Sequence, residues 1–212
     1  ISLDGCHFAN QLDDAVNIHG IHYLVTGVEG PRRLRLARVH FQQHGVSCGF
    51  PGDEVHFRDQ QSMCPSRHNR IASVEEIDDE FLLVDFENDH GLSAGNRHVM
   101  ENLRWTPQIR IRDCDFRDNR ARGILVSSPQ RTEITGNFLS SAGASVKISG
   151  DANYWFESGS VTDVRIEGNV FANGNYGPRQ WGRAAIDIDP EIADPWSAPE
   201  PFHRNITIMA NI

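Results

Sequence analysis

One frame recurs in the segments Ile109-Arg-Ile-Arg-Asp-Cys114-Asp-Phe116, Thr132-Glu-Ile-Thr-Gly-Asn137-Phe-Leu139 and Val164-Arg-Ile-Glu-Gly-Asn169-Val-Phe171. Each segment alternates apolar and polar residues, as a half-buried strand does, and then reaches Asn or Cys followed by a large apolar residue. The same frame opens the sequence at 1–8 and returns at 206–212. The last four copies begin 23, 32 and 42 residues apart, so 23 residues is the bare repeat and the excess marks loops. The pattern predicts a solenoid in which each copy is one rung.

A second strand follows the first in four copies, and these strands align without gaps. Their inward residues form two columns, which are Val16, Ile124, Val146 and Ile186, and Ile18, Val126, Ile148 and Ile188. Parallel strands bury such columns only against neighbouring rungs. At the turn after the first strand, Asn137, Asn169 and Asn211 can adopt left-handed backbone and can hydrogen-bond along the stack. Cys6 and Cys114 hold the same position and are interpreted as small buried residues.

The first two copies begin 108 residues apart, which is too far for one rung, so we expect an insertion between them. Alternating segments at 33–41, 53–57, 70–76 and 80–86 lie within it, separated by turn sequences. Short strands separated by turns favour a small barrel or sandwich. The predicted fold is therefore all-β, with right-handed parallel β-helix rungs at 1–20 and 104–212 and an inserted β-barrel-like domain at 21–103.

Composition narrows the classes of partner. The formal charge of −9 and the scattered arginines argue against nucleic acid, and no run of eighteen apolar residues suggests a membrane span. No CxxC pair is present, and a bridge between Cys48 and Cys64 stays open. His40 and His44 have the helical spacing of metal ligands, but they lie in or beside a strand, so no metal is expected.

Acidic and polar residues cluster in the segment Asp13-Asp14-Ala-Val-Asn17-Ile-His19. Residues between the inward columns point outward and line up along the stack, which adds Arg122, Lys147 and Asp187 to this face. Glycoside hydrolysis needs one carboxylic acid to protonate the leaving oxygen and one carboxylate to activate water or attack. Adjacent acids on a strand point to opposite faces, so the Asp13-Asp14 pair needs a bend or a carboxylate on a neighbouring rung. The alternatives are that one aspartate caps a turn and that this face is only solvated.

Three consecutive aromatic residues lie in the loop 150–159, and they cannot all belong to the core. Sugar binding needs an aromatic ring against the apolar face of the sugar and carboxylate or amide groups for its hydroxyls. Trp155, with Asp151 and Glu157, fits that role. The alternative is a hydrophobic plug against the side of the β-helix.

The cluster at 13–19, the insertion after it and the motif Asp151-Ala-Asn-Tyr-Trp-Phe-Glu-Ser-Gly159 resemble glycoside hydrolase family 110. The resemblance covers nearly the whole chain, and the aromatic motif is its most specific part. Members of that family are exo-acting, inverting α-1,3-galactosidases that embed β-barrel domains within a β-helix. The resemblance implies a galactose-containing glycan as substrate, no cofactor and a secreted or periplasmic location. Oligomeric state stays open, a homo-oligomer included.

The resemblance also implies roles for residues. An aspartate of the pair Asp13 and Asp14 would be catalytic, with its partner about one rung earlier and therefore before Ile1. The family is much longer than this chain, so we expect the sequence to be a fragment. The predicted glycan contacts are Asn17, His19, Arg122, Lys147, Asp151, Trp155, Glu157 and Asp187.

Two other functions remain open on the sequence. One is another β-helix carbohydrate enzyme, a polygalacturonase-like hydrolase or a polysaccharide lyase, in which Arg122 and Lys147 would face a uronate carboxylate. The other is a non-catalytic β-helix that binds glycans.

Overall fold

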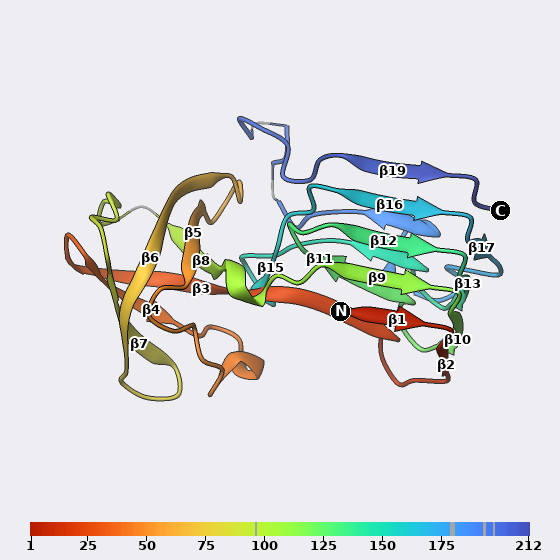
Figure 1. Ribbon diagram of the computed structural model, residues 1–212, viewed down its shortest axis with the longest axis horizontal. Helices are drawn as coiled ribbons and strands as arrows, with labels where there is room; N and C mark the ends of the chain where they lie inside the picture. Colours follow the sequence, from red (N-terminus) through yellow and green to blue (C-terminus); the bar gives the residue numbers. More distant parts are fainter. Residues whose placement is uncertain (96, 179–180, 193, 197) are drawn as a thin grey trace.

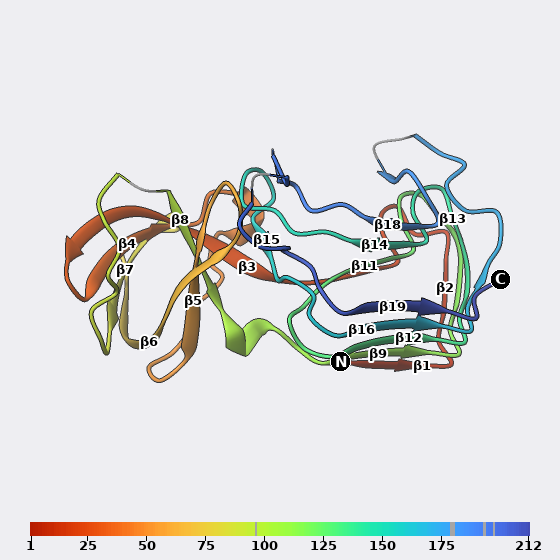
Figure 2. The ribbon, with the colours of Figure 1, turned by 90° about the horizontal axis from the view of Figure 1, so that it is seen from above.

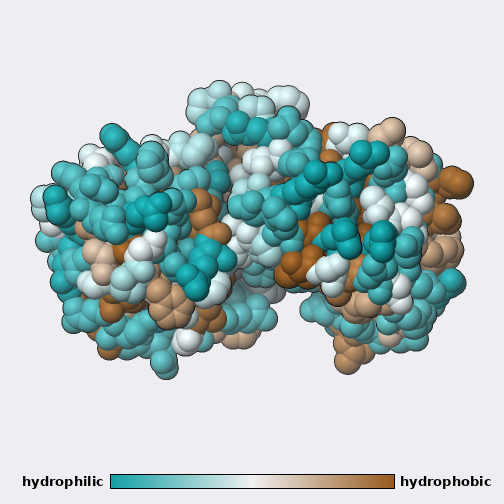
Figure 3. Space-filling model, viewed as in Figure 1, coloured by the Kyte–Doolittle hydropathy of each residue, from teal (hydrophilic) through white to brown (hydrophobic). Residues whose placement is uncertain are grey.

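The structure is a computed structural model that describes residues 1–95, 97–178, 181–192, 194–196 and 198–212. Figure 1 shows two parts side by side, an antiparallel barrel on the left and a set of parallel sheets on the right, here called the parallel stack. Strands, turns and loops make up most of the described residues, and the short 3-10 helices η1 (Phe41–Gln43) and η2 (Leu103–Trp105) lie among them. A notch at the lower margin of Figure 3 separates the two parts, whose visible surface is mostly hydrophilic. Among these residues no helix has the length and apolar character needed to cross a membrane.

Three sheets form the parallel stack, and the chain visits them in turn (Figure 2). The first contains β1 (Ser2–Asp4), β9 (Ile109–Arg112), β12 (Thr132–Thr135), β16 (Val164–Glu167) and β19 (Ile206–Met209). The second contains β2 (His7–Ala9), β10 (Asp115–Asn119), β13 (Phe138–Ser141) and β17 (Val170–Phe171). The third contains β3 (Val16–Gly30), β11 (Ile124–Ser127), β14 (Val146–Ile148) and β18 (Ile186–Ile188). Within each sheet the strands follow one another in chain order, so each pass of the chain lies on the previous one.

The register of the third sheet confirms the two predicted apolar columns. Val16 pairs with Ile124, which pairs with Val146, which pairs with Ile186, and the second column pairs in the same way. The column residues of β3, β11 and β14 are buried in one continuous core. Ile188 is 42% exposed, because β18 is the last described strand of its sheet and no further strand covers it.

A ladder of asparagine side chains runs along the turn between the first and second sheets. Asn169 Oδ1 accepts hydrogen bonds from the backbone and side-chain nitrogens of Asn137, both at 2.9 Å. Asn211 Oδ1 accepts the equivalent pair from Asn169 at 3.0 and 2.9 Å. The backbone nitrogen of Cys114 donates to Asn137 Oδ1 at 2.9 Å, and that of Cys6 donates to Cys114 Sγ at 3.4 Å. The predicted hydrogen bonding along the stack is confirmed.

The left-handed backbone conformation expected at these asparagines lies one residue earlier in the chain. The positive φ angle falls on the residue before each, at 65° for Gly136, 64° for Gly168 and 53° for Ala210. The chain turns at that residue, and the asparagine side chain is then free to point along the stack. Glycine has no Cβ and adopts this conformation without strain, which explains why two of these three residues are glycine.

Replacing Asn169 by Ala is expected to lower the free energy of unfolding by about 3 kcal/mol. The change leaves the buried backbone nitrogen of Asn137 without its acceptor and the carbonyl of Ile134 without its 2.9 Å donor, and each unsatisfied buried group costs about 1–3 kcal/mol. Urea denaturation measures the effect, and Thr207→Ala, an exposed change on β19, is the control. An equal, small loss in both variants would show that the ladder contributes little.

Six antiparallel strands close the barrel. They are β3, β4 (Arg33–Ala37), β7 (Phe81–Phe86), β6 (Pro65–Glu76), β5 (Glu54–Asp59) and β8 (His98–Asn102), and β8 pairs back to β3. Its core is lined by Tyr23, Leu34, Leu36, Cys48, Val55, Phe57, Ile71, Leu82, Val84, Phe86 and Met100. All four cysteines of the chain are free thiols, Cys48 and Cys64 included. The strand predicted at 33–41 is too long, because β4 ends at Ala37 and the chain turns into η1.

Strand β3 belongs to both parts of the molecule. It pairs in parallel with β11 from Val16 to His19 and antiparallel with β8 and β4 from His22 onward. The strand is continuous through residue 20, where the sequence analysis predicts the boundary between the β-helix and the inserted domain. The domain limits stay a prediction. The short strand β15 (Glu157–Ser158) pairs antiparallel with β3 at Ile21 and Gly20, so the loop 151–157 lies against the junction.

A buried ion pair lies at this junction. Arg58 Nε donates to Glu101 Oε1 at 2.5 Å, and the two side chains are 6% and 0% exposed. Burial raises the pKa of Glu101, but the charge and hydrogen bond of Arg58, together with the nearby His22 and His56, outweigh burial, and the pKa is lowered. Arg58 also donates to the carbonyl of Met63 at 3.0 Å and to Ser160 Oγ, in the segment between β15 and β16, at 3.3 Å. Burial lowers the pKa of the adjacent His22.

Candidate functional site

A pocket of about 530 Å³ opens at the outer face of the third sheet. Its lining residues are Asp13, Asp14, Asn17, Gln42, Arg120, Arg122, Leu125, Lys147, Ser149, Asp151, Trp155, Glu157, Trp181 and Glu191. Eight of the ten site residues predicted from the sequence are among them, and the other two, His19 and Asp187, contact members of the lining. Segments more than a hundred residues apart in the chain therefore meet in one cavity.

The two adjacent aspartates face the same pocket. The chain bends at Leu12 and Asp13, before β3 begins, so the alternation of a regular strand does not separate Asp13 from Asp14. Asp14 Oδ1 accepts hydrogen bonds from the backbone nitrogen of Arg122 at 3.0 Å and from its Nε at 2.8 Å. The Asp14 side chain is only 7% exposed, whereas Asp13 is exposed. One carboxylate is thus fixed in position and the other is open to solvent.

Glu157 brings a third carboxylate into the pocket. Its Oε1 accepts a hydrogen bond from Asn17 Nδ2 at 3.2 Å and lies 3.3 Å from His19 Nε2. His19 Nδ1 is 2.6 Å from the carbonyl oxygen of Gly20, and a carbonyl only accepts, so Nδ1 carries a proton. An imidazole and a carboxylate therefore lie side by side at the wall of the pocket.

Lys147 lies between two further acids. Its Nζ is 3.3 Å from Asp187 Oδ2 and 3.3 Å from Asp189 Oδ2. The register places Lys147 beside Leu125 on one strand and Asp187 on the next, as the predicted outward column requires. These side chains point away from the core of the stack, but Leu125, Lys147 and Asp187 are 3%, 7% and 8% exposed. The interpretation of this face as simply solvated is therefore wrong for these three residues.

Asp151 holds the aromatic loop in shape. Its carboxylate accepts backbone hydrogen bonds from Asn153 at 2.7 Å, Tyr154 at 2.8 Å, Phe156 at 3.0 Å and also from Trp155. Phe156 is buried, whereas Tyr154 is 66% and Trp155 is 47% exposed. The expectation that three aromatics cannot all be core is confirmed. Tyr154 and Trp155 do not form a hydrophobic plug against the side of the stack, because both rings are exposed to solvent.

Both cations that a uronate-cleaving enzyme would use are already paired with acids. Arg122 binds Asp14, and Lys147 binds Asp187 and Asp189. A substrate carboxylate would have to compete with these partners. In the described part of the chain, no group of three or more His, Cys, Asp or Glu side chains is arranged to hold a metal ion.

Sequence reasoning missed several residues of the lining. Gln42 comes from the barrel insertion, 23 residues after His19, the nearest predicted site residue, and carries no motif. Arg120 and Trp181 lie together, with the guanidinium carbon 5.7 Å from the ring centre. Glu191 follows the last strand of the third sheet. No pattern in the sequence marks Gln42, Trp181 or Glu191 as site residues. Arg120 fits the outward alternation, but only the structure shows that it faces the pocket.

An all-β fold with a pocket lined by carboxylates, amide groups and an exposed tryptophan is typical of proteins that bind or cleave carbohydrates. Residues 33–94 match the family model described as GLAA-B beta-barrel domain II. The whole chain is similar to Alpha-1,3-galactosidase B of Bacteroides thetaiotaomicron, with 35% identity over 214 residues that make up 34% of that protein. It is also similar over its whole length to Alpha-1,3-galactosidase A of Bacteroides fragilis, at 36% identity, and of Shewanella woodyi, at 30%, covering 35% and 34% of those proteins.

The chain is thus a homologue of α-1,3-galactosidases of the glycoside hydrolase family 110 type. It spans about a third of the length of these curated relatives.

Proposed function

We propose that the intact protein is an exo-acting glycoside hydrolase that releases terminal α-1,3-linked galactose from glycans with inversion at the anomeric carbon. The observation that supports this most strongly is the gathering of Asp13, Asp14 and Glu157 in one pocket, in a chain homologous throughout to α-1,3-galactosidases. Hydrolysis with inversion needs an acid and a base on opposite sides of the glycosidic bond.

The proposed roles follow from the contacts of each residue. Asp14, held by Arg122, or its neighbour Asp13 acts as acid or base, and the partner carboxylate is expected one rung earlier on the family's pattern. Asn17 and Glu157, which are hydrogen-bonded to each other, and the neighbouring His19 are suited to sugar hydroxyls, and the exposed ring of Trp155 is suited to the apolar face of a sugar. Lys147 with Asp187 supplies further polar contacts, and Asp151 keeps the Trp155 loop in place.

The experiment that tests the proposal follows the anomeric proton by NMR while the intact protein hydrolyses an α-1,3-linked galactose disaccharide. Inversion yields β-galactose first, and the α anomer then grows in as the sugar mutarotates. If α-galactose comes first, the enzyme retains configuration and the proposed mechanism is wrong. If no galactose forms, while the disaccharide binds saturably, the protein is a glycan-binding protein.

Three further assignments are part of the proposal. The parallel stack is interpreted as a stretch of right-handed parallel β-helix, with the barrel inserted as a domain at 21–103. The location is secreted or periplasmic, by analogy with the family. Galactosidase activity that cofractionates with the cytoplasm of the source cell would contradict the location.

A further inference from the structure

Exposed aromatic residues gather beside the pocket, and they come from both parts of the molecule. The His40 ring lies 4.8 Å from the ring of Trp155 and 6.0 Å from that of Tyr154. It also lies 4.5 Å from the ring of Phe41. Phe41 is 69% exposed and Tyr154 66% exposed. Exposed apolar patches beside polar residues mark sites where a ligand or partner binds.

The barrel holds its share of this cluster in a fixed turn. Gln43 Oε1 accepts a hydrogen bond from the His40 backbone nitrogen at 3.1 Å, and the Gln42 nitrogen donates to His40 Nδ1 at 3.4 Å, which together make a capping box. Gln43 is buried and donates through Nε2 to the carbonyl of His22 on β3 at 3.1 Å. The turn is therefore tied to the same strand that carries Asn17 and His19.

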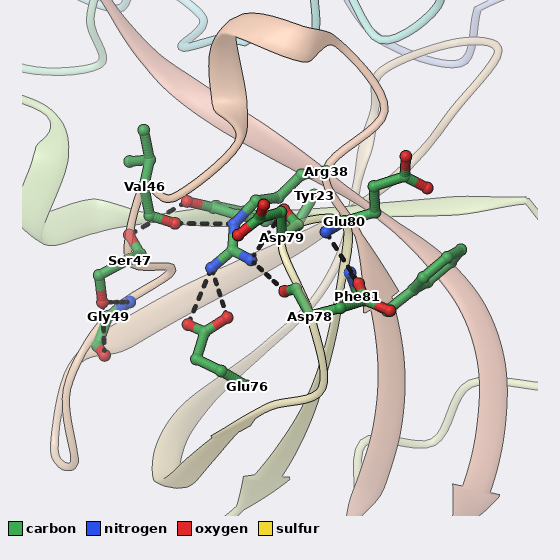
Figure 4. Close-up of polar contacts among 10 residues, drawn as sticks. All are labelled: Tyr23, Arg38, Val46, Ser47, Gly49, Glu76, Asp78, Asp79, Glu80 and Phe81. Atoms are coloured by element: carbon green, nitrogen blue, oxygen red, sulfur yellow. Dashed lines mark hydrogen bonds and ion pairs between the residues drawn. The ribbon is translucent and has the colours of Figure 1, made fainter.

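Arg38 closes the loop that contains the turn (Figure 4). Its side chain is 2% exposed; Nε donates to the carbonyl of Val46 at 2.8 Å, and its terminal nitrogen binds both oxygens of Glu76 at 2.8 and 2.7 Å. A second terminal nitrogen reaches the carbonyls of Asp78 and Asp79 at 3.4 and 3.3 Å. The ends of the loop 38–46 are thus fixed to each other and to the turn between β6 and β7.

We infer that the turn His40-Phe41-Gln42 of the barrel, together with Tyr154, binds the sugar unit to which the departing galactose is attached. This rests on the proposed function and specifies the substrate side of the same site. Gln42 lines the pocket itself, and Phe41, the residue before it in the same turn, is exposed and contacts the His40 ring, so the turn places an amide group at the pocket and an exposed ring beside it. An acceptor sugar presents both an apolar face and hydroxyl groups, which match an exposed ring beside an amide side chain.

The test compares two substrates of the intact protein. α-Galactosyl fluoride has a single atom as its leaving group, so it uses the galactose position alone, whereas an α-1,3-linked galactose trisaccharide also occupies the proposed acceptor position. In Phe41→Ala the ratio of kcat/KM for the trisaccharide to that for the fluoride is expected to fall about tenfold, equivalent to about 1.4 kcal/mol. The loss should lie mainly in KM for the trisaccharide.

Phe50→Ala is the matched control, because Phe50 is a half-exposed aromatic of the same barrel that packs on Trp105 and Arg104 instead. Its substrate ratio should equal that of the wild type. A Phe41→Ala ratio equal to the control overturns the acceptor site and leaves the proposed function standing. Failure of the wild type to hydrolyse either substrate overturns the proposed function and the acceptor site with it. Because Phe41 is exposed, thermal melting of the variant should match that of the control.

Discussion

Asp14→Asn is expected to lower kcat for release of galactose by about 10²–10⁴-fold in the intact protein, the range that a positioned acid or base contributes. The amide keeps the size of the side chain, and its oxygen can still accept the 3.0 Å hydrogen bond from the backbone of Arg122. The fold and the pocket should therefore persist while the ionisable group is lost. Initial rates with an α-1,3-linked galactose disaccharide measure the change, and thermal melting checks the fold.

Asp4→Asn provides the control for this experiment. Asp4 pairs with Arg112 across neighbouring passes of the chain, as Asp14 pairs with Arg122, but both side chains are 46% exposed and neither lines the pocket. Its kcat should equal that of the wild type. Turnover by Asp14→Asn within threefold of the control would show that Asp14 is not catalytic, and the same assay on Asp13→Asn would then decide whether the role belongs to its neighbour.

Arg58→Ala is expected to destabilise the protein by about 3–5 kcal/mol, because it leaves the carboxylate of Glu101 buried without its cation. Arg70→Ala removes an exposed ion pair with Glu54 on the same barrel, where the two side chains are 48% and 55% exposed, and should cost about 0–1 kcal/mol. Urea denaturation at pH 7 compares the two variants. Equal losses would mean that the buried pair contributes no more than the surface pair.

A double replacement distinguishes the contribution of the ion pair itself from the cost of leaving one buried charge without a partner. Arg58→Met with Glu101→Leu removes both charges and should recover much of the stability lost in Arg58→Ala, because apolar residues of similar volume replace buried ion pairs at little cost. Because Arg58 holds the pKa of Glu101 below its ordinary value of 4.5, Glu101 stabilises the wild type above that pH, and this contribution is lost as pH falls through the lowered pKa. The double variant lacks that acid-sensitive contribution.

The parallel sheets could be predicted because each pass repeats a local pattern. Val16, Ile124 and Val146 each follow the same alternation, and the register pairs them as aligned in the sequence. The barrel lacks such internal repetition. The second half of β3 and all of β8 were missed, since their pairing with each other depends on residues nearly eighty positions apart. The end of β4 was misplaced because the capping contacts of His40 and Gln43 outweigh the strand-like alternation of residues 38–41.

The candidate site was predictable where its residues lie on the repeated strand. Asn17, Lys147 and Asp187 follow from the outward alternation alone. The approach of Glu157 to His19 was not predictable, because β15 pairs antiparallel with β3 and breaks the repeat. Gln42 lies at the pocket in a turn that Gln43 ties to His22 on β3, a tertiary contact that no local pattern encodes.

The continuity of β3 bears on how the chain reaches its native state. Strand β1 must find β9, its neighbour in the first sheet, across more than a hundred intervening residues, and the entropy of closing a loop rises with its length. Pairing of His22 with Glu101 in the closed barrel draws the two ends of that long segment together. If the barrel forms early, only the short segments between the barrel and strands β1 and β9 still have to be ordered before these strands pair. Formation of the barrel would then lower the entropic cost of pairing the first two passes of the chain.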